Sequence, residues 1–171
     1  MKRSSDEEKR QLEHDAAKLF LRCYEQQLGI HMRNIWHNEP NKPDVSCYQE
    51  DEQLDIEIAH LYASETEAMA VLGRPLSMQM QRDLADMAQK PSEHRLRAAL
   101  ERLLKQKAKK RYYSKRTWLV IRNASTIWRK ADFEAVIDDL NFPRTYQFEQ
   151  IWLVCDFYCG ELLRVDEKRP I

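Results

Sequence analysis

The sequence has little of what marks several common protein classes. It contains only three glycines in 171 residues, which excludes collagen-like and glycine-rich repetitive structures. None of its four cysteines forms a CxxC pair, so they are predicted to be small buried residues or free thiols. A zinc site that uses Cys155 and Cys159 is the alternative, but no second pair of ligands stands near them in the sequence.

Membrane segments and nucleotide-binding motifs are missing as well. The longest apolar runs, such as Trp118–Ile121, are too short to span a bilayer, and no apolar leader follows Met1. We therefore expect a cytoplasmic protein with no membrane partner. The chain has no P-loop, no G-x-G-x-x-G and no G-x-S-x-G segment, so nucleotide cofactors and serine-hydrolase chemistry have no support.

Charge is abundant but segregated along the chain. Lys and Arg together number 28, as do Asp and Glu, so the formal net charge is zero. Residues 102–130 nevertheless hold eleven Lys or Arg and no acid, whereas residues 43–73 hold eight acids and no Lys or Arg. This pattern indicates either a polyanion held beside a cation site or two segments that neutralise each other.

Hydrophobic periodicity predicts one α/β domain over residues 1–171. The first helix is expected to start at a capping box, Ser5–Glu8, and to stop at Gly29. Further helices are expected as two short pieces within 63–89, from residue 91 onward, and over 131–140; strands are expected near 30–36, 45–48, 54–58, 117–121, 151–154 and 162–165. Helices between buried strands imply a central mixed β-sheet flanked by helices on both faces. Residues 1–8 and 166–171 are expected to fray.

Three carboxylates are predicted to converge on one hairpin. Asp44 stands at the end of one strand, and Asp55 and Glu57 share one face of the next. Such carboxylates repel each other unless a divalent cation neutralises them, and oxygen ligands favour Mg²⁺ or Mn²⁺. A cation of this kind can activate water and stabilise charge on a phosphodiester.

Each of these residues also has a structural interpretation. Asp55 and Glu57 fit the solvated face of an edge hairpin, and Asp44 after a proline fits a turn. His60, at the strand end, fits either a proton carrier or a structural residue.

The succession of elements from Glu13 to Val165 resembles the PD-(D/E)XK nuclease superfamily. Pro43-Asp44 looks like its first acidic motif, and Asp55-Ile56-Glu57 or Glu57-Ile58-Ala59 looks like its second. The resemblance implies a restriction endonuclease-like fold and a Mg²⁺- or Mn²⁺-dependent endonuclease that acts on DNA. It further implies that Asp44, Glu57 and Asp55 are catalytic and that the metal ligands are Asp44, Glu57 and a glutamate of the first helix, for which Glu13 is preferred over Glu25.

One position departs from the motif of that superfamily. The motif's lysine falls on Ala59 or on Glu57 itself, depending on which acid is counted second. Some members of the superfamily carry a glutamate at that position, and others recruit a lysine from elsewhere, for which Lys107 is preferred here over Lys105 and Lys109 because it lies mid-helix. The alternative is a degenerate site that binds nucleic acid or a protein partner without cleavage.

The basic segment, defined as residues 105–116, holds seven cations around two tyrosines. Interleaved cations and aromatics suit a phosphate backbone with stacking on exposed bases. The predicted nucleic-acid contacts are Lys105, Lys109, Lys110, Arg111, Tyr112, Tyr113, Lys115 and Arg116. The alternatives are a helix end whose cations favour its dipole, and a surface for an acidic protein. The resemblance also implies a homodimer or a partner protein where duplex DNA must be spanned.

Overall fold

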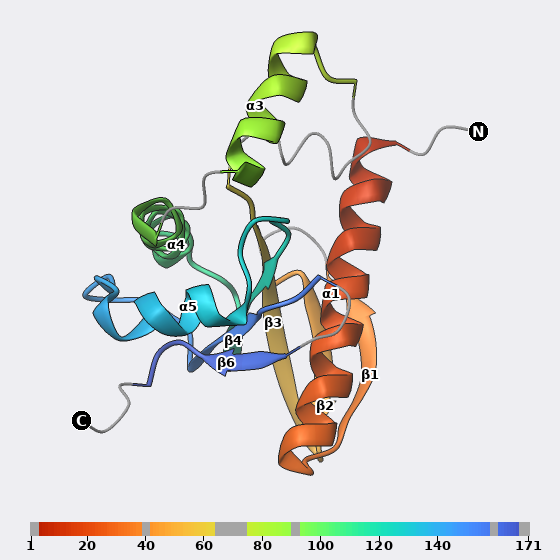
Figure 1. Ribbon diagram of the computed structural model, residues 1–171. Coiled ribbons are helices and arrows are strands. Elements are labelled where there is room, and N and C mark those ends of the chain that lie inside the picture. The colour runs from red at the N-terminus through yellow and green to blue at the C-terminus, as the bar shows by residue number, and fades with distance from the viewer. Residues whose placement is uncertain (1–3, 39–41, 64–74, 90–92, 158–160, 168–171) are drawn as a thin grey trace.

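A six-stranded mixed sheet forms the centre of the molecule (Figure 1). The structure is a computed structural model that describes residues 4–38, 42–63, 75–89, 93–157 and 161–167. The strands, in their order across the sheet, are β1 (Met32–His37), β2 (Val45–Gln49), β3 (Glu52–Leu61), β4 (Thr117–Asn123), β5 (Gln150–Val154) and β6 (Leu162–Arg164). The predicted α/β class with a central mixed sheet is therefore confirmed.

Strand direction changes across the sheet. β1, β2 and β3 are antiparallel neighbours, β3, β4 and β5 run parallel, and β6 returns antiparallel at the edge. Parallel neighbours require long crossover connections, and helices provide them here. α3 (Met78–Gln89) and α4 (Glu93–Ala108) lie between β3 and β4 in the chain, and α5 (Lys130–Val136), followed by a 3-10 turn (Ile137–Asp139), lies between β4 and β5.

Helices cover both faces of the sheet, and each face has its own apolar core. On one face, α1 (Ser5–Leu28) packs Phe20 and Tyr24 against Trp118 and Trp152. On the other face, α4 and α5 cover the remaining side chains of β4 and β5 (Figure 1). β4 is consequently buried at every position, as its continuous apolar run predicts.

The first helix begins one residue earlier than predicted. Ser4, not Ser5, is the N-cap: its hydroxyl accepts from the Glu7 amide at 3.2 Å, and the Glu7 carboxylate accepts from the Ser4 amide at 3.2 Å. The repeated serines and glutamates of this stretch permit both registers. The first turn, expected to fray, is thus capped helix. At the other terminus Asp166 also departs from that expectation, since it accepts from the Ile151 amide at 3.0 Å.

The hairpin that carries the acids is not at an edge of the sheet, so that interpretation of Asp55 and Glu57 is wrong. β3 is ten residues long rather than the five predicted, and it pairs on its second side with β4. The acidic face of the strand is covered by α4 and by the segment before β4, which place Lys107, Tyr112 and Ser114 on it. The exposed fractions of Asp55 and Glu57 are only 8% and 3%.

Several other predictions can be compared with the described residues. Cys23, Cys47 and Cys155 are buried thiols, and burial raises the pKa of both Cys47 and Cys155 to about 12. The alternative zinc site cannot be followed, because Cys159 lies outside the described residues. So do residues 64–74 of the region in which two short helices were expected; in its described part, residues 75–89, the structure has one helix, α3. In the described part of the chain, no helix is both long and apolar enough to cross a membrane.

Candidate functional site

The candidate site lies where β2 begins beside the middle of β3. Val45, the first residue of β2, pairs with Ile56, so Asp44 lies opposite Glu57. Because β2 does not extend as far as Ile58, the amide of Ile58 donates instead to Asp44 Oδ2 at 2.9 Å. The backbone of β3 therefore fixes the Asp44 side chain next to Glu57. We call Asp44 and Glu57 the acidic pair.

The acidic pair holds one proton. Burial raises the pKa of Asp44 to about 8, and the adjacent Glu57 and the more distant charge of Glu13 add to this effect. Burial opposes ionisation of Glu57 too, but the hydrogen bond from Asp44 and the nearby Lys107 and Tyr112 hold its pKa below the usual range. At neutral pH the Asp44 carboxyl is thus protonated and donates to an ionised Glu57.

Lys107 and Tyr112 reach Glu57 from the basic segment. The Lys107 ammonium, in the last turn of α4, lies 3.0 Å from Glu57 Oε2, and the Tyr112 hydroxyl donates to the same oxygen. Burial and the Glu57 charge raise the pKa of Tyr112, so its hydroxyl remains a donor. The structure thus places Lys107, the lysine preferred from the sequence, next to Glu57. Ala59, by contrast, is buried in the core.

Tyr112 is a site residue that the sequence interpretation placed on the nucleic-acid surface. Its backbone is held on both sides by Gln147, which accepts from the Tyr112 amide and donates to the Tyr112 carbonyl, both at 2.8 Å. Its ring packs on Phe148, with centroids 6.0 Å apart. Nothing in the local sequence indicates this inward position, because Gln147 and Phe148 stand about 35 residues away along the chain.

Glu13 approaches the acidic pair from α1 without contacting it directly. Its side chain is buried, and burial raises its pKa, an effect that Lys9 at 4.0 Å opposes. The negative charge of Glu57 raises the pKa of Glu13 further. Among the described residues no group of three or more His, Cys, Asp or Glu side chains is close enough to hold one metal ion. Glu13, the predicted third metal ligand, therefore acts on the acidic pair through its negative charge, which raises the pKa of Asp44.

Asp55 has a different set of partners from the acidic pair. Its Oδ1 accepts from Ser46 at 2.5 Å and from Gln53 at 3.1 Å, and its Oδ2 accepts from Ser114. Asn38 in turn donates to the Ser46 hydroxyl at 2.7 Å. Although Asp55 shares a strand face with Glu57, its carboxylate joins β2 and β3 to the segment before β4. We assign it a structural role rather than the predicted catalytic one.

The predicted nucleic-acid contacts divide into an exposed set and an internal set. The exposed residues are Lys105, Lys109, Lys110, Arg111, Tyr113 and Lys115. Tyr112 faces the acidic pair, and Arg116 is bound internally: its guanidinium donates to Glu149 at 3.1 Å, Glu52 at 3.0 Å and Gln49 at 2.8 Å. Arg116 therefore ties the β2–β3 hairpin to the residue before β5, and its predicted contact with nucleic acid stays a prediction.

His60 stands beyond the acidic pair at the end of β3 and is half-buried. Burial, followed by the charges of Arg122 and Lys107, lowers its pKa to about 4. Its Nε2 has no hydrogen-bond partner within the described part of the chain. The ring is thus neutral at pH 7.

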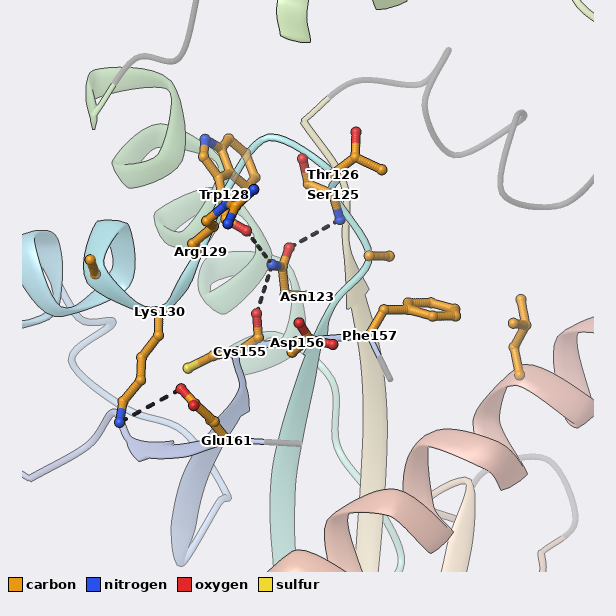
Figure 2. Close-up of a pocket in the computed structure, with 13 residues that line it drawn as sticks. Asn123, Ser125, Thr126, Trp128, Arg129, Lys130, Cys155, Asp156, Phe157 and Glu161 are labelled. Atoms are coloured by element: carbon orange, nitrogen blue, oxygen red, sulfur yellow. Dashed lines mark hydrogen bonds and ion pairs between the residues drawn. The ribbon is translucent and has the colours of Figure 1, made fainter. Parts of the chain in front are cut away.

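Figure 2 shows a separate pocket of about 840 Å³ at the carboxyl ends of β4 and β5, which contains none of the predicted site residues. Asn123 donates there to the carbonyls of Trp128 and Cys155, both at 2.9 Å, and accepts from the Ser125 amide at 3.0 Å. These hydrogen bonds hold the loops in place. Glu161, one of the two acids among the described lining residues, lies 3.7 Å from the Lys130 ammonium.

Comparison of the chain with models of protein families, with curated proteins and with solved structures finds no match. We therefore infer the function of the protein from the geometry of its site.

Proposed function

We propose that this protein is a divalent-cation-dependent phosphodiesterase that acts on DNA. The observation that carries the proposal is the assembly of Asp44, Glu57 and Lys107, from three separate segments of the chain, into one cluster around the buried Glu57 carboxylate. A structural ion pair needs only one acid and one base. Here the Asp44 carboxyl is also held beside Glu57, and its pKa is raised as a result. Groups with strongly shifted pKa values cluster at functional sites.

The donor set of the acidic pair fits Mg²⁺ or Mn²⁺. Mg²⁺ is commonly bound through one or two carboxylates and keeps several of its waters, so two acids suffice. The proton shared by Asp44 and Glu57 marks a place where positive charge is needed, and a cation can take the place of that proton. When bound, the cation would supply Lewis acidity toward the phosphate and its attacking water.

The residues of the chain would then divide the work. Asp44 and Glu57 hold the cation, and the Lys107 ammonium donates a hydrogen bond to the attacking water or to a phosphate oxygen. Tyr112 positions Glu57 through its hydroxyl, and Glu13 adds negative potential. This arrangement also supports our proposal that the chain belongs to the PD-(D/E)XK superfamily, with Lys107 of α4 in the role that its motif gives to a lysine at Ala59.

The test combines calorimetric titration of Mg²⁺ and Mn²⁺ with cleavage of single- and double-stranded DNA. We compare wild type with Asp44→Asn, Lys107→Met and the control Asp51→Asn, which alters an exposed acid in the β2–β3 turn. We expect Asp44→Asn to lose cation binding and cleavage. Lys107→Met should bind the cation but cleave at least about 100-fold more slowly. Asp51→Asn should resemble wild type.

The outcomes separate the proposal from its competitors. Undiminished cleavage by Asp44→Asn would remove the acidic pair as the site. Cation-independent cleavage that persists in EDTA would contradict the cation requirement.

A second candidate function is nucleic-acid binding without cleavage. Two hydrogen bonds favour this candidate, because Lys107 and Tyr112 both donate to Glu57 Oε2. These donors satisfy an oxygen that a cation would otherwise use. Absence of cation binding in wild type, together with salt-sensitive DNA binding, would establish this candidate in place of the first.

A further inference from the structure

A basic groove lies on the side of α4 that faces away from the acidic pair. It has a volume of about 590 Å³ and separates the end of α4 from the loop after the 3-10 turn. We define the basic groove by its four cations and two apolar wall residues: Lys105, Lys109, Arg111, Arg144, Phe142 and Pro143. Arg144 lies outside the basic segment, and only the fold brings it there.

The positive charge of the basic groove is not neutralised by the protein. All four of its cations are exposed, and none forms an ion pair within the described residues. Its one acid, Glu101, accepts from the Asn141 amide at 3.0 Å. Arg97 and Lys130, by contrast, do meet acids across elements, at 3.4 and 3.7 Å. Four like charges around one hollow repel each other, and an anionic ligand relieves that repulsion.

Helix geometry relates the basic groove to the acidic pair. Residues two apart on an α-helix point in nearly opposite directions, because each residue adds about 100°. Lys107 points to Glu57, so Lys105 on α4 points away from it toward the groove, and Lys109, which directly follows the last residue of α4, lines the same groove. The loop from Arg144 to Gln147, which holds Tyr112, also borders both places.

We propose that the basic groove is a second phosphate-binding subsite, which holds the sugar-phosphate backbone of the same nucleic acid whose phosphodiester lies at the acidic pair. This inference rests on the proposed function for its ligand. The two places are separated by the thickness of a helix, on the order of 10 Å. A strand that advances about 3.4 Å per nucleotide covers that distance in about three nucleotides. Contacts of Lys and Arg side chains with phosphates hold the backbone independently of its sequence.

The experiment measures binding of a fluorescein-labelled DNA oligonucleotide by anisotropy, in EDTA, at several NaCl concentrations. EDTA removes the contribution of the acidic pair's cation and prevents cleavage. The groove variant is Lys109→Gln/Arg144→Gln. The control is Lys18→Gln/Arg22→Gln, which removes one exposed lysine and one exposed arginine from α1. Thermal melting of both variants verifies that the fold is retained, as expected for exposed side chains.

We expect the groove variant to bind at least about tenfold more weakly than wild type near 100 mM NaCl. The slope of log K against log[NaCl] should fall in magnitude by about two, one for each lost phosphate contact. The control should keep the wild-type slope, and a second oligonucleotide of equal length but different sequence should give the same result. Equal affinity and slope in wild type and groove variant would overturn the proposal, as would absence of binding to wild type at low salt.

The two proposals fail in different ways. If wild type cleaves no DNA but binding depends on the groove cations, the basic groove stands and the phosphodiesterase proposal falls. If Asp44→Asn abolishes cleavage while the groove variant binds and cleaves like the control, the acidic pair stands and the basic groove falls.

Discussion

Asp44 and Glu57 are both carboxylic acids, yet the fold holds them in opposite protonation states. Burial and the neighbouring Glu57 keep the proton on Asp44, while Lys107 and Tyr112 help to keep Glu57 ionised. The difference arises from which donors reach which oxygen, not from the residue types. At this scale the site is therefore best probed by removing one donor at a time.

We predict that Lys107→Met destabilises the protein by about 2 kcal/mol. The substitution keeps the apolar stem but removes the ammonium from a Glu57 that is only 3% exposed. Removal of one partner from a buried ion pair commonly costs about 3–5 kcal/mol, and we expect less here because Tyr112 still donates to the same oxygen. Urea unfolding at pH 7 in EDTA measures the change.

A matched control lies on the same helix. Lys105→Met makes the same substitution at an exposed position and should change stability by no more than about 0.5 kcal/mol. In the double variant Lys107→Met/Glu57→Gln, the uncompensated charge is gone, so part of the lost stability should return. If Lys107→Met and Lys105→Met are equally stable, the ion pair contributes nothing to the fold.

At the scale of elements, the boundaries of α1 are set by local chemistry that the sequence displays. Ser4 and Glu7 cap its start, and Gly29 ends it with a left-handed φ of 68° while its amide donates to the Glu25 carbonyl at 2.9 Å. The predicted stop at Gly29 is confirmed. No atom lies within 4 Å of the place where a β-carbon would be added, so sterics from neighbours do not restrict this position.

We predict that Gly29→Ala costs about 1 kcal/mol of stability, because alanine pays the left-handed backbone penalty without any compensating contact. Gly29→Asn should cost less, since asparagine tolerates this conformation better. Thermal or urea unfolding of the two variants measures both values. If Gly29→Ala leaves the stability unchanged or raises it, the left-handed conformation of residue 29 does not contribute to the stability of α1.

At the scale of the molecule, resistance to acid depends partly on a histidine that several elements surround. His60 is the next-to-last residue of β3, and burial, followed by the charges of Arg122 on β4 and Lys107 on α4, lowers its pKa to about 4. The unfolded chain takes up this proton near the ordinary value of 6.5. The stabilising effect of the neutral ring is thus complete above pH 6.5 and is lost as the pH falls through 4.

We predict that wild type loses about 1–2 kcal/mol more stability than His60→Gln between pH 7 and pH 4. The variant keeps a polar side chain but has no proton to take up, while the carboxylates contribute to both proteins alike. Urea unfolding across this pH range gives the difference. A parallel pH dependence in the two proteins would show that His60 is not the group responsible.

Much of the architecture follows from patterns that act over short distances along the chain. Periodicities of two and about 3.6 residues indicate which segments are strands and helices, and helices between buried strands require covered faces. The opposition of Asp44 and Glu57 is of the same kind, because one hairpin contains both residues and its register places them face to face. These features depend on neighbours within about 15 residues, so the sequence alone determines them.

Tertiary structure decided the rest. Parallel pairing with β4 makes β3 an internal strand, and α4 and the segment before β4 bury acids that the sequence could equally assign to a solvated edge. The contacts that single out Lys107 and turn Tyr112 inward join residues 50 and 55 positions apart. Arg116 is held in the protein by partners in two distant places along the chain, the β2–β3 hairpin and Glu149. Local patterns carry no information on such contacts, because they depend on where α4 and the later strands pack against the sheet.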